Sequence, residues 1–489
     1  MKGQPVNIGG ANRRALCSNA NHRNLSNRIA LFFERISMRT FLASIFAALT
    51  LLVSGCSDSV TLSIEHCYPS GMAADLALTD PARTLGATGD YNYTLCSARY
   101  ERVISAAIVT NGAIPNTTQS RASFVGIDSA HFALTFESVW NVTLTPASLR
   151  QALDTHCSSP SAWGPMLTKL GLAGPDAASK FQRNQCANST YVNTMLFGNN
   201  GLFRNNGSAF ARTVSSEQNG ATVLTWTRGY LLQRYGKPGC TDCQVTDEYR
   251  IVIDAGSSGT RLSLYQITAN GNGAYPQVTW LTTLKLGSTD KGIDDFVRTA
   301  NPGEVNTKVI GPLFTKLQTD YTNNANWLAT AQNVKVDLLA TAGMREAEAK
   351  HGKAAIDNFY ALIKTYITNQ AKTGSSAPAN RTSTAEEVRT IDGNSEEGVW
   401  SWTNLNDHYC RYFKANPDPL AECANTTNGM YGVVEVGGAS TQVSFPVSGN
   451  TDPANNRYAV TIGGKSATVY NKTFLGLGQD LARTSMAAQ

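Results

Sequence analysis

The chain lacks a surplus of charge outside its first 40 residues. Only 16% of its 489 residues are charged, and the formal net charge is +5. Seven lysines and arginines against one glutamate give the first 40 residues a net charge of +6, so the rest carries −1. Proteins that bind nucleic acid cluster positive charge along one face. We therefore expect no nucleic-acid partner, and the sequence indicates no protein partner.

Near its start the chain also lacks an apolar run long enough to cross a bilayer. Phe41–Val53 is a mostly apolar run of 13 residues, shorter than the ~20 residues that a spanning helix needs. A short apolar core behind basic residues is typical of an export signal. Residues before Met38 fit no such signal, so we expect Met38 to be the true start.

The end of this run resembles the bacterial lipobox. Residues 53–56 read Val-Ser-Gly-Cys, and in a lipobox the cysteine becomes the lipidated first residue. We therefore expect residues 1–55 to be a leader and lipoprotein signal peptide, with a lipid anchor at Cys56. Export to the outer membrane or the cell surface follows from this expectation. The alternative is an ordinary cleaved signal with a chance cysteine.

Eight of the ten cysteines follow Cys56, and an even number in an exported chain predicts disulfides. Cys157 with Cys186, and Cys410 with Cys423, are close enough in sequence to pair, although the sequence leaves the connectivity open. Cys240 and Cys243 form a CxxC pair without a second one, which favours a disulfide over zinc. The other cysteines are Cys67 and Cys96.

The sequence pattern changes near residue 247. Residues 56–246 contain no motif with chemistry, and we expect an exported, disulfide-containing α+β region of unknown role. From Glu248 the pattern is three strands, a helix, a strand, a helix and a strand, and the same series restarts at Tyr431. It then ends early, with 54 residues after Glu435. Uncovered strands expose an apolar sheet face, so either the chain is a fragment, which we favour, or another part completes the second series.

Two glycine-rich segments carry the most specific signal. Residues 252–261 read VIDAGSSGTR and residues 434–442 read VEVGGASTQ. Each is an apolar strand that reaches a carboxylate and then a tight turn of glycine and small hydroxyl residues. Backbone N–H groups in such turns bind anions, and a carboxylate beside them can hold a hydrated cation. The pattern predicts two loops that hold a phosphate chain.

Two further segments complete a family signature. Residues 341–345 read TAGMR and residues 396–402 read EEGVWSW. With the two loops they resemble the four ordered signature segments of the apyrases, the ecto-nucleoside triphosphate diphosphohydrolases, over about half of the chain. Any one of these motifs alone is weak, but four in order are specific.

The resemblance implies an α/β, actin-like (RNase H-like) fold with two lobes. Residues 247–395 would form lobe I, and residues 396–489 an inter-lobe helix and an incomplete lobe II. It also implies hydrolysis of the terminal phosphate of nucleoside tri- and diphosphates with Ca²⁺ or Mg²⁺ as cofactor.

Hydrolysis of a terminal phosphate requires positioning of the phosphoryl group, neutralisation of its charge and an aimed water. By resemblance, Glu397 is the general base, Ser440 and Gln442 orient the water, and Arg345 supplies positive charge. Asp254 and Glu435 would hold the metal ion. The predicted phosphate contacts are Ser257, Ser258, Gly259, Thr260, Arg261, Thr341, Ala342, Gly437, Gly438, Ala439 and Ser440.

Other interpretations compete with this one. An exopolyphosphatase or guanosine-pentaphosphate phosphatase shares the fold, but Ala439 and Gln442 favour the apyrase pattern. A non-catalytic surface lipoprotein with a vestigial phosphatase domain is the alternative of another class. Glu435 stands where the family usually has aspartate. Residues 459–466 (AVTIGGKS) fit a permissive Walker A pattern, but the β-prone residues after them predict a hairpin turn instead.

Overall fold

The computed structural model describes most of the chain after residue 63. The described residues are 64–70, 89–112, 123–135, 145–159, 168, 184–204, 210–216, 218–219, 222–236, 248–268, 275–286, 292–297, 299–321, 333–373, 382–414, 419, 421–424, 429–447 and 455–488. They belong to one compact unit, Leu62–Gln489. The expected leader, Cys56, Cys240 and Cys243 lie outside the described residues. Within these ranges no helix has both the length and the apolar character of a membrane span.

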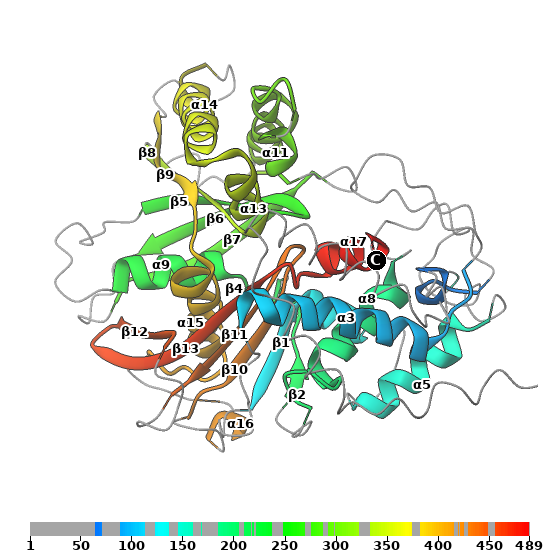
Figure 1. Cartoon of the computed structure of the whole chain (residues 1–489). Helices are drawn as coiled ribbons and strands as arrows, with labels where there is room; N and C mark the ends of the chain where they lie inside the picture. Colours follow the sequence, from blue (N-terminus) through cyan, green and yellow to red (C-terminus); the bar gives the residue numbers. More distant parts are fainter. Residues whose placement is uncertain are drawn as a thin grey trace, which may run out of the picture. The chain divides into compact units, whose positions relative to one another are not determined.

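The first of two large sheets forms as the sequence predicts. Its strand order is β7-β6-β5-β8-β9, in which β5, β6 and β7 are antiparallel neighbours and β8 and β9 run parallel to β5 (Figure 1). The strands are β5 (Glu248–Gly256), β6 (Gly259–Thr268), β7 (Gln277–Lys285), β8 (Asn333–Ala340) and β9 (Thr382–Thr390). Each overlaps a predicted strand, because apolar or alternating residues mark the segments from β5 to β8.

The second sheet combines strands from both ends of the described chain. Its order is β12-β13-β11-β10-β1-β2. Strands β10 to β13 are antiparallel neighbours, whereas β1 runs parallel to β10 and β2 runs parallel to β1. The strands are β1 (Phe124–Asp128), β2 (Phe210–Thr213), β10 (Gly432–Val436), β11 (Ser440–Pro446), β12 (Arg457–Ile462) and β13 (Lys465–Leu475).

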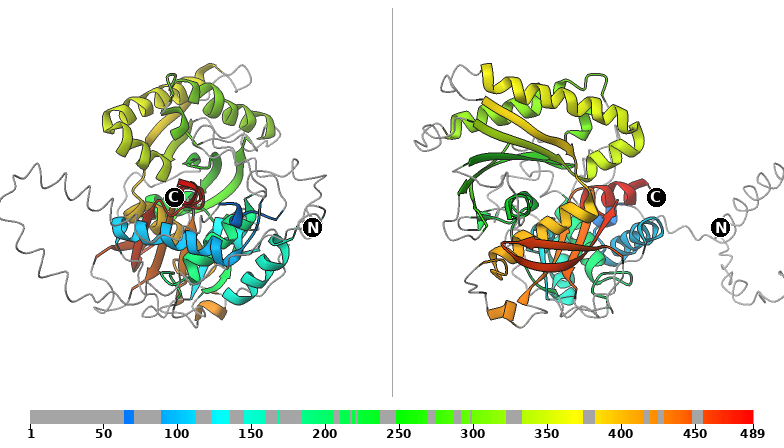
Figure 2. Two further views of the ribbon diagram at one scale, coloured as in Figure 1. Left: turned by 45° about the vertical axis from the view of Figure 1, so that its right-hand side comes forward. Right: turned by 90° about the vertical axis from the view of Figure 1, so that its left-hand side faces the viewer.

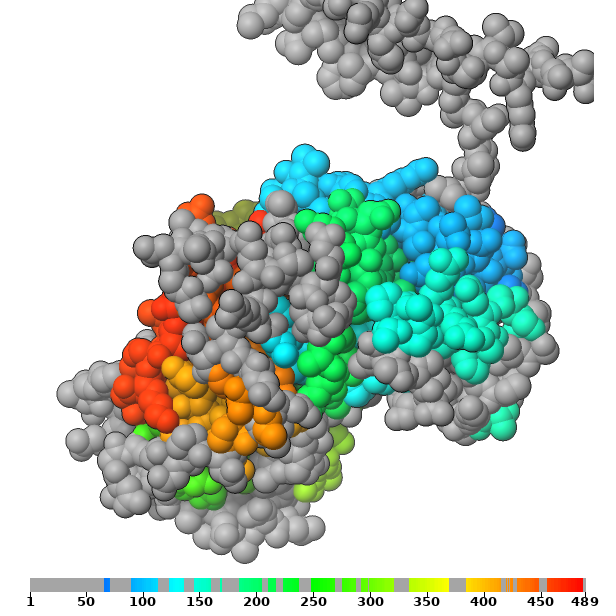
Figure 3. All heavy atoms as spheres, turned by 90° about the horizontal axis from the view of Figure 1, so that it is seen from below, coloured from blue at the N-terminus to red at the C-terminus, as the bar shows by residue number. Residues whose placement is uncertain are grey.

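This arrangement corrects the expectation of an incomplete second lobe preceded by a separate region. In the first sheet the two parallel strands follow the antiparallel ones in sequence, whereas in the second sheet they precede them. Strands β1 and β2 therefore occupy the positions that the short C-terminal segment leaves empty. In the space-filling view, cyan and green residues of the N-terminal half lie against orange residues of the C-terminal segment (Figure 3). The physical reason is that the apolar edge of β10 needs a paired neighbour.

Helices cover both sheets in layers (Figure 2). One face of the first sheet packs on α11 and α14, and its other face packs on α9 and α15. The far face of the second sheet packs on α3, α8 and α17. These helices are α3 (Tyr93–Asn111), α8 (Gln185–Phe197), α9 (Trp226–Gly236), α11 (Gly311–Tyr321), α14 (Lys353–Thr373), α15 (Gly398–His408) and α17 (Gln479–Ala488).

The predicted inter-lobe helix is therefore present as α15, and α9 from the N-terminal half packs beside it. The remaining elements complete the fold. They are η1 (Ile64–Cys67), α4 (Ser129–Thr135), α5 (Pro146–Cys157), β3 (Gln218–Asn219), β4 (Thr222–Val223), α10 (Asp294–Val297), η5 (Asn306–Ile310), α13 (Ala342–His351), η6 (Gly393–Glu397) and α16 (Ala421–Ala424).

Two local predictions have clear outcomes. The amphipathic pattern of residues 345–371 predicts a single long helix. This prediction is wrong, because Gly352 has a φ of +82° and divides the segment into α13 and α14. Such a left-handed glycine ends a helix. The hairpin expected at residues 459–466 is confirmed, since Gly463 and Gly464, both with positive φ, join β12 to β13.

Three disulfides lie in the described residues: Cys67–Cys96, Cys157–Cys186 and Cys410–Cys423. The last two are the pairs that sequence proximity favours. The first two join helices around the second sheet, in the same buried cluster as strand β10.

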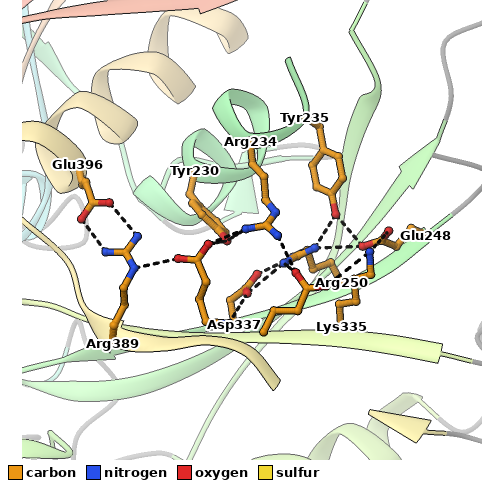
Figure 4. A network of polar contacts seen from close by, with 11 residues as sticks. Tyr230, Arg234, Tyr235, Glu248, Arg250, Lys335, Asp337, Arg389 and Glu396 are labelled. Carbon is orange, nitrogen blue, oxygen red and sulfur yellow. Dashed lines mark hydrogen bonds and ion pairs between the residues drawn. The ribbon is translucent and has the colours of Figure 1, made fainter. Parts of the chain in front are cut away.

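A network of ion pairs ties the N-terminal half to the first sheet (Figure 4). The fully buried Arg250 of β5 makes two hydrogen bonds to Asp337 of β8, at 2.5 and 3.0 Å, and also contacts Glu386 of β9. Arg234 of α9 reaches Glu386 at 2.7 Å and Glu387 at 2.6 Å. Because buried charges are tolerated only when they are paired, this network fixes α9 against the sheet.

Candidate active site

The two glycine-rich loops are hairpins of the same construction. In the first, Asp254 of β5 pairs with Arg261 of β6. In the second, Glu435 of β10 pairs with Gln442 of β11. Each carboxylate thus lies at the same position relative to its turn, one in each sheet.

The two turns approach each other closely. A Cβ atom added to Gly438 would lie only 2.7 Å from Ser257 Oγ, so a larger residue would push the turns apart. The second turn is held from behind by α17, where the N–H groups of Gln479 and Asp480 donate to the carbonyls of Gly437 and Gly438, each at 2.9 Å. The C-terminal helix therefore fixes the position of this loop.

Glu397, at the end of η6, is 6% exposed and belongs to a polar cluster. Arg345 of α13 donates from Nη2 to Glu397 Oε2 at 2.7 Å and to Ser440 Oγ at 3.2 Å. Gln442 Nε2 donates to Ser440 Oγ at 2.7 Å. The four predicted catalytic residues are therefore joined by direct contacts, although they come from three elements, α13, η6 and β11.

The neighbouring Glu396 has a different surrounding. Arg389 makes two hydrogen bonds of 2.8 Å to its carboxylate, which also accepts from the N–H of Asp392 at 2.7 Å. Such a two-point pair is geometrically specific. Of two adjacent glutamates, Glu396 anchors the segment to β9 while Glu397 faces the cluster.

The two predicted metal carboxylates are buried and resist ionisation. Burial raises the pKa of Asp254 to about 7, against the opposing effect of Arg261, whose Nη1 lies 3.4 Å from Asp254 Oδ2. Burial, and then the charge of Glu397, raises the pKa of Glu435 well above its usual range, although Ser401 donates a hydrogen bond to it. Both carboxylates would gain from a nearby cation.

A cavity of about 340 Å³ brings the predicted residues together. Nine of them line it: Asp254, Ser257, Ser258, Arg261, Thr341, Glu397, Glu435, Gly437 and Gly438. Arg345, Ser440 and Gln442 do not line it but contact Glu397 or one another. Gly259, Thr260, Ala342 and Ala439 are in the same loops without lining the cavity. Its size suits a small polar ligand.

Comparison with known proteins agrees with this geometry. Residues 241–489, just over half of the chain, match the model of the GDA1/CD39 (nucleoside phosphatase) family. The chain belongs to this family.

The names of two curated relatives also refer to nucleoside triphosphates. Ectonucleoside triphosphate diphosphohydrolase 1 of Bos taurus is 28% identical over 239 residues, which are 48% of this chain and 42% of that protein. Nucleoside-triphosphatase ntp-1 of Caenorhabditis elegans is 28% identical over 249 residues, 47% of this chain and 38% of that protein. The matches thus span about two fifths of the relatives' length. A crystal structure of nucleoside triphosphate hydrolases from Neospora caninum aligns with a TM-score of 0.34 and 20% identity, covering 48% of this chain and 46% of that chain.

Sequence reasoning missed the part of the site that comes from the N-terminal half. Asp128, at the end of β1, lines the cavity together with Phe132, Ser216 and Trp226. One signal was available for Asp128, since it follows an apolar strand just as Asp254 and Glu435 do. Nothing in the sequence links that strand to the family motifs, which begin more than 100 residues later.

The family implies a divalent cation, and the donor set here fits one. Asp254 Oδ1 is buried and makes no hydrogen bond within the described residues, and Glu435 lines the same cavity. Carboxylate oxygens are the ligands that Ca²⁺ and Mg²⁺ prefer. Across the described part of the chain, no group of three or more His, Cys, Asp or Glu side chains is close enough to hold a metal ion by itself.

Proposed function

We propose that this chain hydrolyses the terminal phosphate of nucleoside tri- and diphosphates, using a water molecule activated by Glu397. Membership of a nucleoside phosphatase family supports the class of reaction. The names of the curated relatives support nucleotides as substrates.

The observation that carries the proposal is a set of buried polar atoms around the cavity. Asp254 Oδ1, Arg345 Nε and Gln442 Oε1 make no hydrogen bond within the described residues. A buried polar atom without a partner costs about 1–3 kcal/mol. Asp254 lines the cavity, and Arg345 and Gln442 belong to the polar cluster of Glu397, which also lines it, so the three atoms together indicate a site built for ligands that complete the hydrogen bonding.

The proposed role of each residue follows from its position in the site. The turns at Ser257 and Gly438 present backbone N–H groups to the phosphate chain. Glu397 accepts a proton from water, whose oxygen then bonds to the terminal phosphorus as the bond to the leaving oxygen breaks. Ser440 and Gln442 hydrogen-bond that water and orient it. Arg345 holds the Glu397 carboxylate in place and adds positive charge beside the phosphoryl oxygens.

The cation proposed at this site would be Ca²⁺ or Mg²⁺, held through water by Asp254 and Glu435. Bound there, it would neutralise charge on the phosphate chain. Ser401 holds the Glu435 carboxylate, which gives the longer glutamate side chain a defined position despite its extra methylene.

Phosphate release from ATP and ADP tests the proposal. The purified chain is assayed with Ca²⁺, Mg²⁺ or EDTA, beside Glu397→Gln and the exposed control Glu304→Gln. We expect metal-dependent release from both nucleotides, about 10²–10⁴-fold slower in Glu397→Gln and unchanged in the control. A Glu397→Gln enzyme as fast as the parent chain would exclude Glu397 as the base. Release from polyphosphate but not from ATP would favour the exopolyphosphatase alternative.

We also propose that a lipid on Cys56 anchors the enzyme to the outer membrane or the cell surface. The lipobox-like sequence before Cys56 supports this proposal. Mass spectrometry of the mature N-terminus would test it, because an unmodified N-terminus elsewhere contradicts lipidation.

A further inference from the structure

The N-terminal half contributes an acidic residue to the cavity. Asp128 is the last residue of β1, which pairs in parallel with β10, and it lines the same cavity as Asp254 and Glu435. In the strand register Ile127 is opposite Glu435 and Asp128 is opposite Val436. Asp128 is thus one position away from direct alignment with Glu435.

The backbone of Asp128 explains how its side chain lines this cavity. Successive residues of a strand place their side chains on opposite faces. A regular strand would therefore put Asp128 on the face opposite to Ile127, and so opposite to Glu435. Instead Asp128 has a φ of +54°, a left-handed conformation that is uncommon for residues other than glycine and is tolerated by aspartate and asparagine. This conformation interrupts the alternation of side chains between the two faces of the sheet, so the Asp128 side chain is not confined to the face opposite Glu435.

A second contact holds the carboxylate. Ser216, 7% exposed and also part of the cavity lining, donates from Oγ to Asp128 Oδ1 at 3.1 Å. In the described part of the chain no lysine or arginine forms an ion pair with Asp128. Its charge also acts on the other carboxylates, since Asp128 is among the causes that raise the pKa of both Asp254 and Glu435.

An independent observation indicates that the carboxylates face a ligand. Asp254 is 7% exposed, lines the cavity, and leaves Oδ1 without a hydrogen bond within the described residues. An ionised carboxylate in such a place requires a positive partner. Arg261 contacts only the other oxygen, Oδ2.

We propose that Asp128 is the third acidic residue of the cation site and binds the water shell of the ion held by Asp254 and Glu435. Such outer contacts typically change metal affinity 10–100-fold. The site would then be assembled from both halves of the chain. This inference rests on the proposed function for the presence of the cation, but it concerns binding rather than hydrolysis.

Calorimetric titration with Ca²⁺ alone, without nucleotide, tests it on the whole chain. The variants are Asp128→Asn, which keeps the size and tolerates positive φ, and Asp128→Glu, which keeps the charge. Asp154→Asn, on α5 and half-exposed, is the matched control. We expect about tenfold weaker Ca²⁺ binding for Asp128→Asn, a smaller loss for Asp128→Glu, and no change for Asp154→Asn.

Parent-like affinity in Asp128→Asn would overturn the inference, and so would a parent chain that binds no Ca²⁺. A phosphate-release assay on the same preparations separates the two proposals. If the parent chain hydrolyses ATP while Asp128→Asn binds Ca²⁺ normally, only the role of Asp128 is wrong. If Asp128→Asn binds Ca²⁺ tenfold more weakly but the parent chain hydrolyses no nucleotide, the cation site is correct and the proposed function is wrong.

Discussion

The raised pKa of Asp254 predicts how the stability of the cation-free protein changes with pH. The pKa of an aspartate in an unfolded chain is about 3.9, whereas burial raises that of Asp254 to about 7. Folding therefore favours the protonated carboxyl. The stability that Asp254 contributes is complete below about pH 4 and is lost as the pH rises through about 7. A shift of about three units corresponds to ~4 kcal/mol.

The variant Asp254→Asn removes this effect while keeping the shape of the side chain. In EDTA, we expect its thermal unfolding midpoint to rise relative to that of the parent chain as the pH increases from 4 to 8. At about 1 °C per kcal/mol for a compact unit of this length, Leu62–Gln489, the relative gain is ~4 °C. Groups far from Asp254 act equally in both proteins, so the difference reports the titration of Asp254 together with its effect on Glu435, whose pKa the charge of Asp254 raises.

Scanning calorimetry in EDTA at several pH values measures this difference. Asp357→Asn, exposed on α14, is the control and should follow the parent chain at every pH. Excess Ca²⁺ at pH 8 should raise the midpoint of the parent chain but not that of Asp254→Asn, because the ion binds the folded state. Equal pH profiles for the parent chain and Asp254→Asn would refute the inference that burial disfavours the ionised form of Asp254.

Three further predictions concern the fold. Residues 247–489 produced alone should be insoluble. Co-production with residues 62–246 should restore a folded complex, as judged by solubility and circular dichroism. A stable 247–489 fragment would contradict the shared second sheet. Asp337→Asn should destabilise the protein by about 3–5 kcal/mol, because it leaves the buried Arg250 short of a partner; an unchanged unfolding midpoint would argue against that pair. Replacing both Cys157 and Cys186 by serine should cost about 3.6 kcal/mol for a loop of 29 residues, measured by denaturation of the oxidised protein.

The first sheet and the two glycine-rich hairpins could be predicted from the sequence because their signals are local. Each strand from β5 to β8 alternates or is apolar, and Asp254 is only seven residues from Arg261, its partner across the hairpin. Helix ends were less accurate, as Gly352 shows. A glycine within an apolar helical pattern is visible, but only the left-handed backbone shows that it ends the helix.

The second sheet could not be predicted in full because its decisive contacts are remote in sequence. Phe124 of β1 pairs with Gly432 of β10, and a Cβ atom on Gly432 would lie 2.6 Å from the Phe124 ring. The sequence showed that β10 to β13 needed a covering layer. It did not show which segment supplied it, since β1 is a short apolar run like several others in residues 56–246. Asp128 was missed for the same reason.

The order of strands has a consequence for how the site forms. The first sheet is built from a contiguous segment, so its contacts can form early and locally, whereas the pair β1–β10 must close a loop of several hundred residues. Until it closes, β10 is an exposed edge and Glu435 has no fixed position relative to Asp128. The position of the second glycine-rich loop also depends on the N-terminal half through α17. This helix holds Gly437 and Gly438 and packs on α3 and α8. We therefore expect the second glycine-rich loop to be the last part of the site to reach its final geometry, and the proposed nucleotide hydrolysis to appear only after β1, β10 and α17 have all assembled around the second sheet.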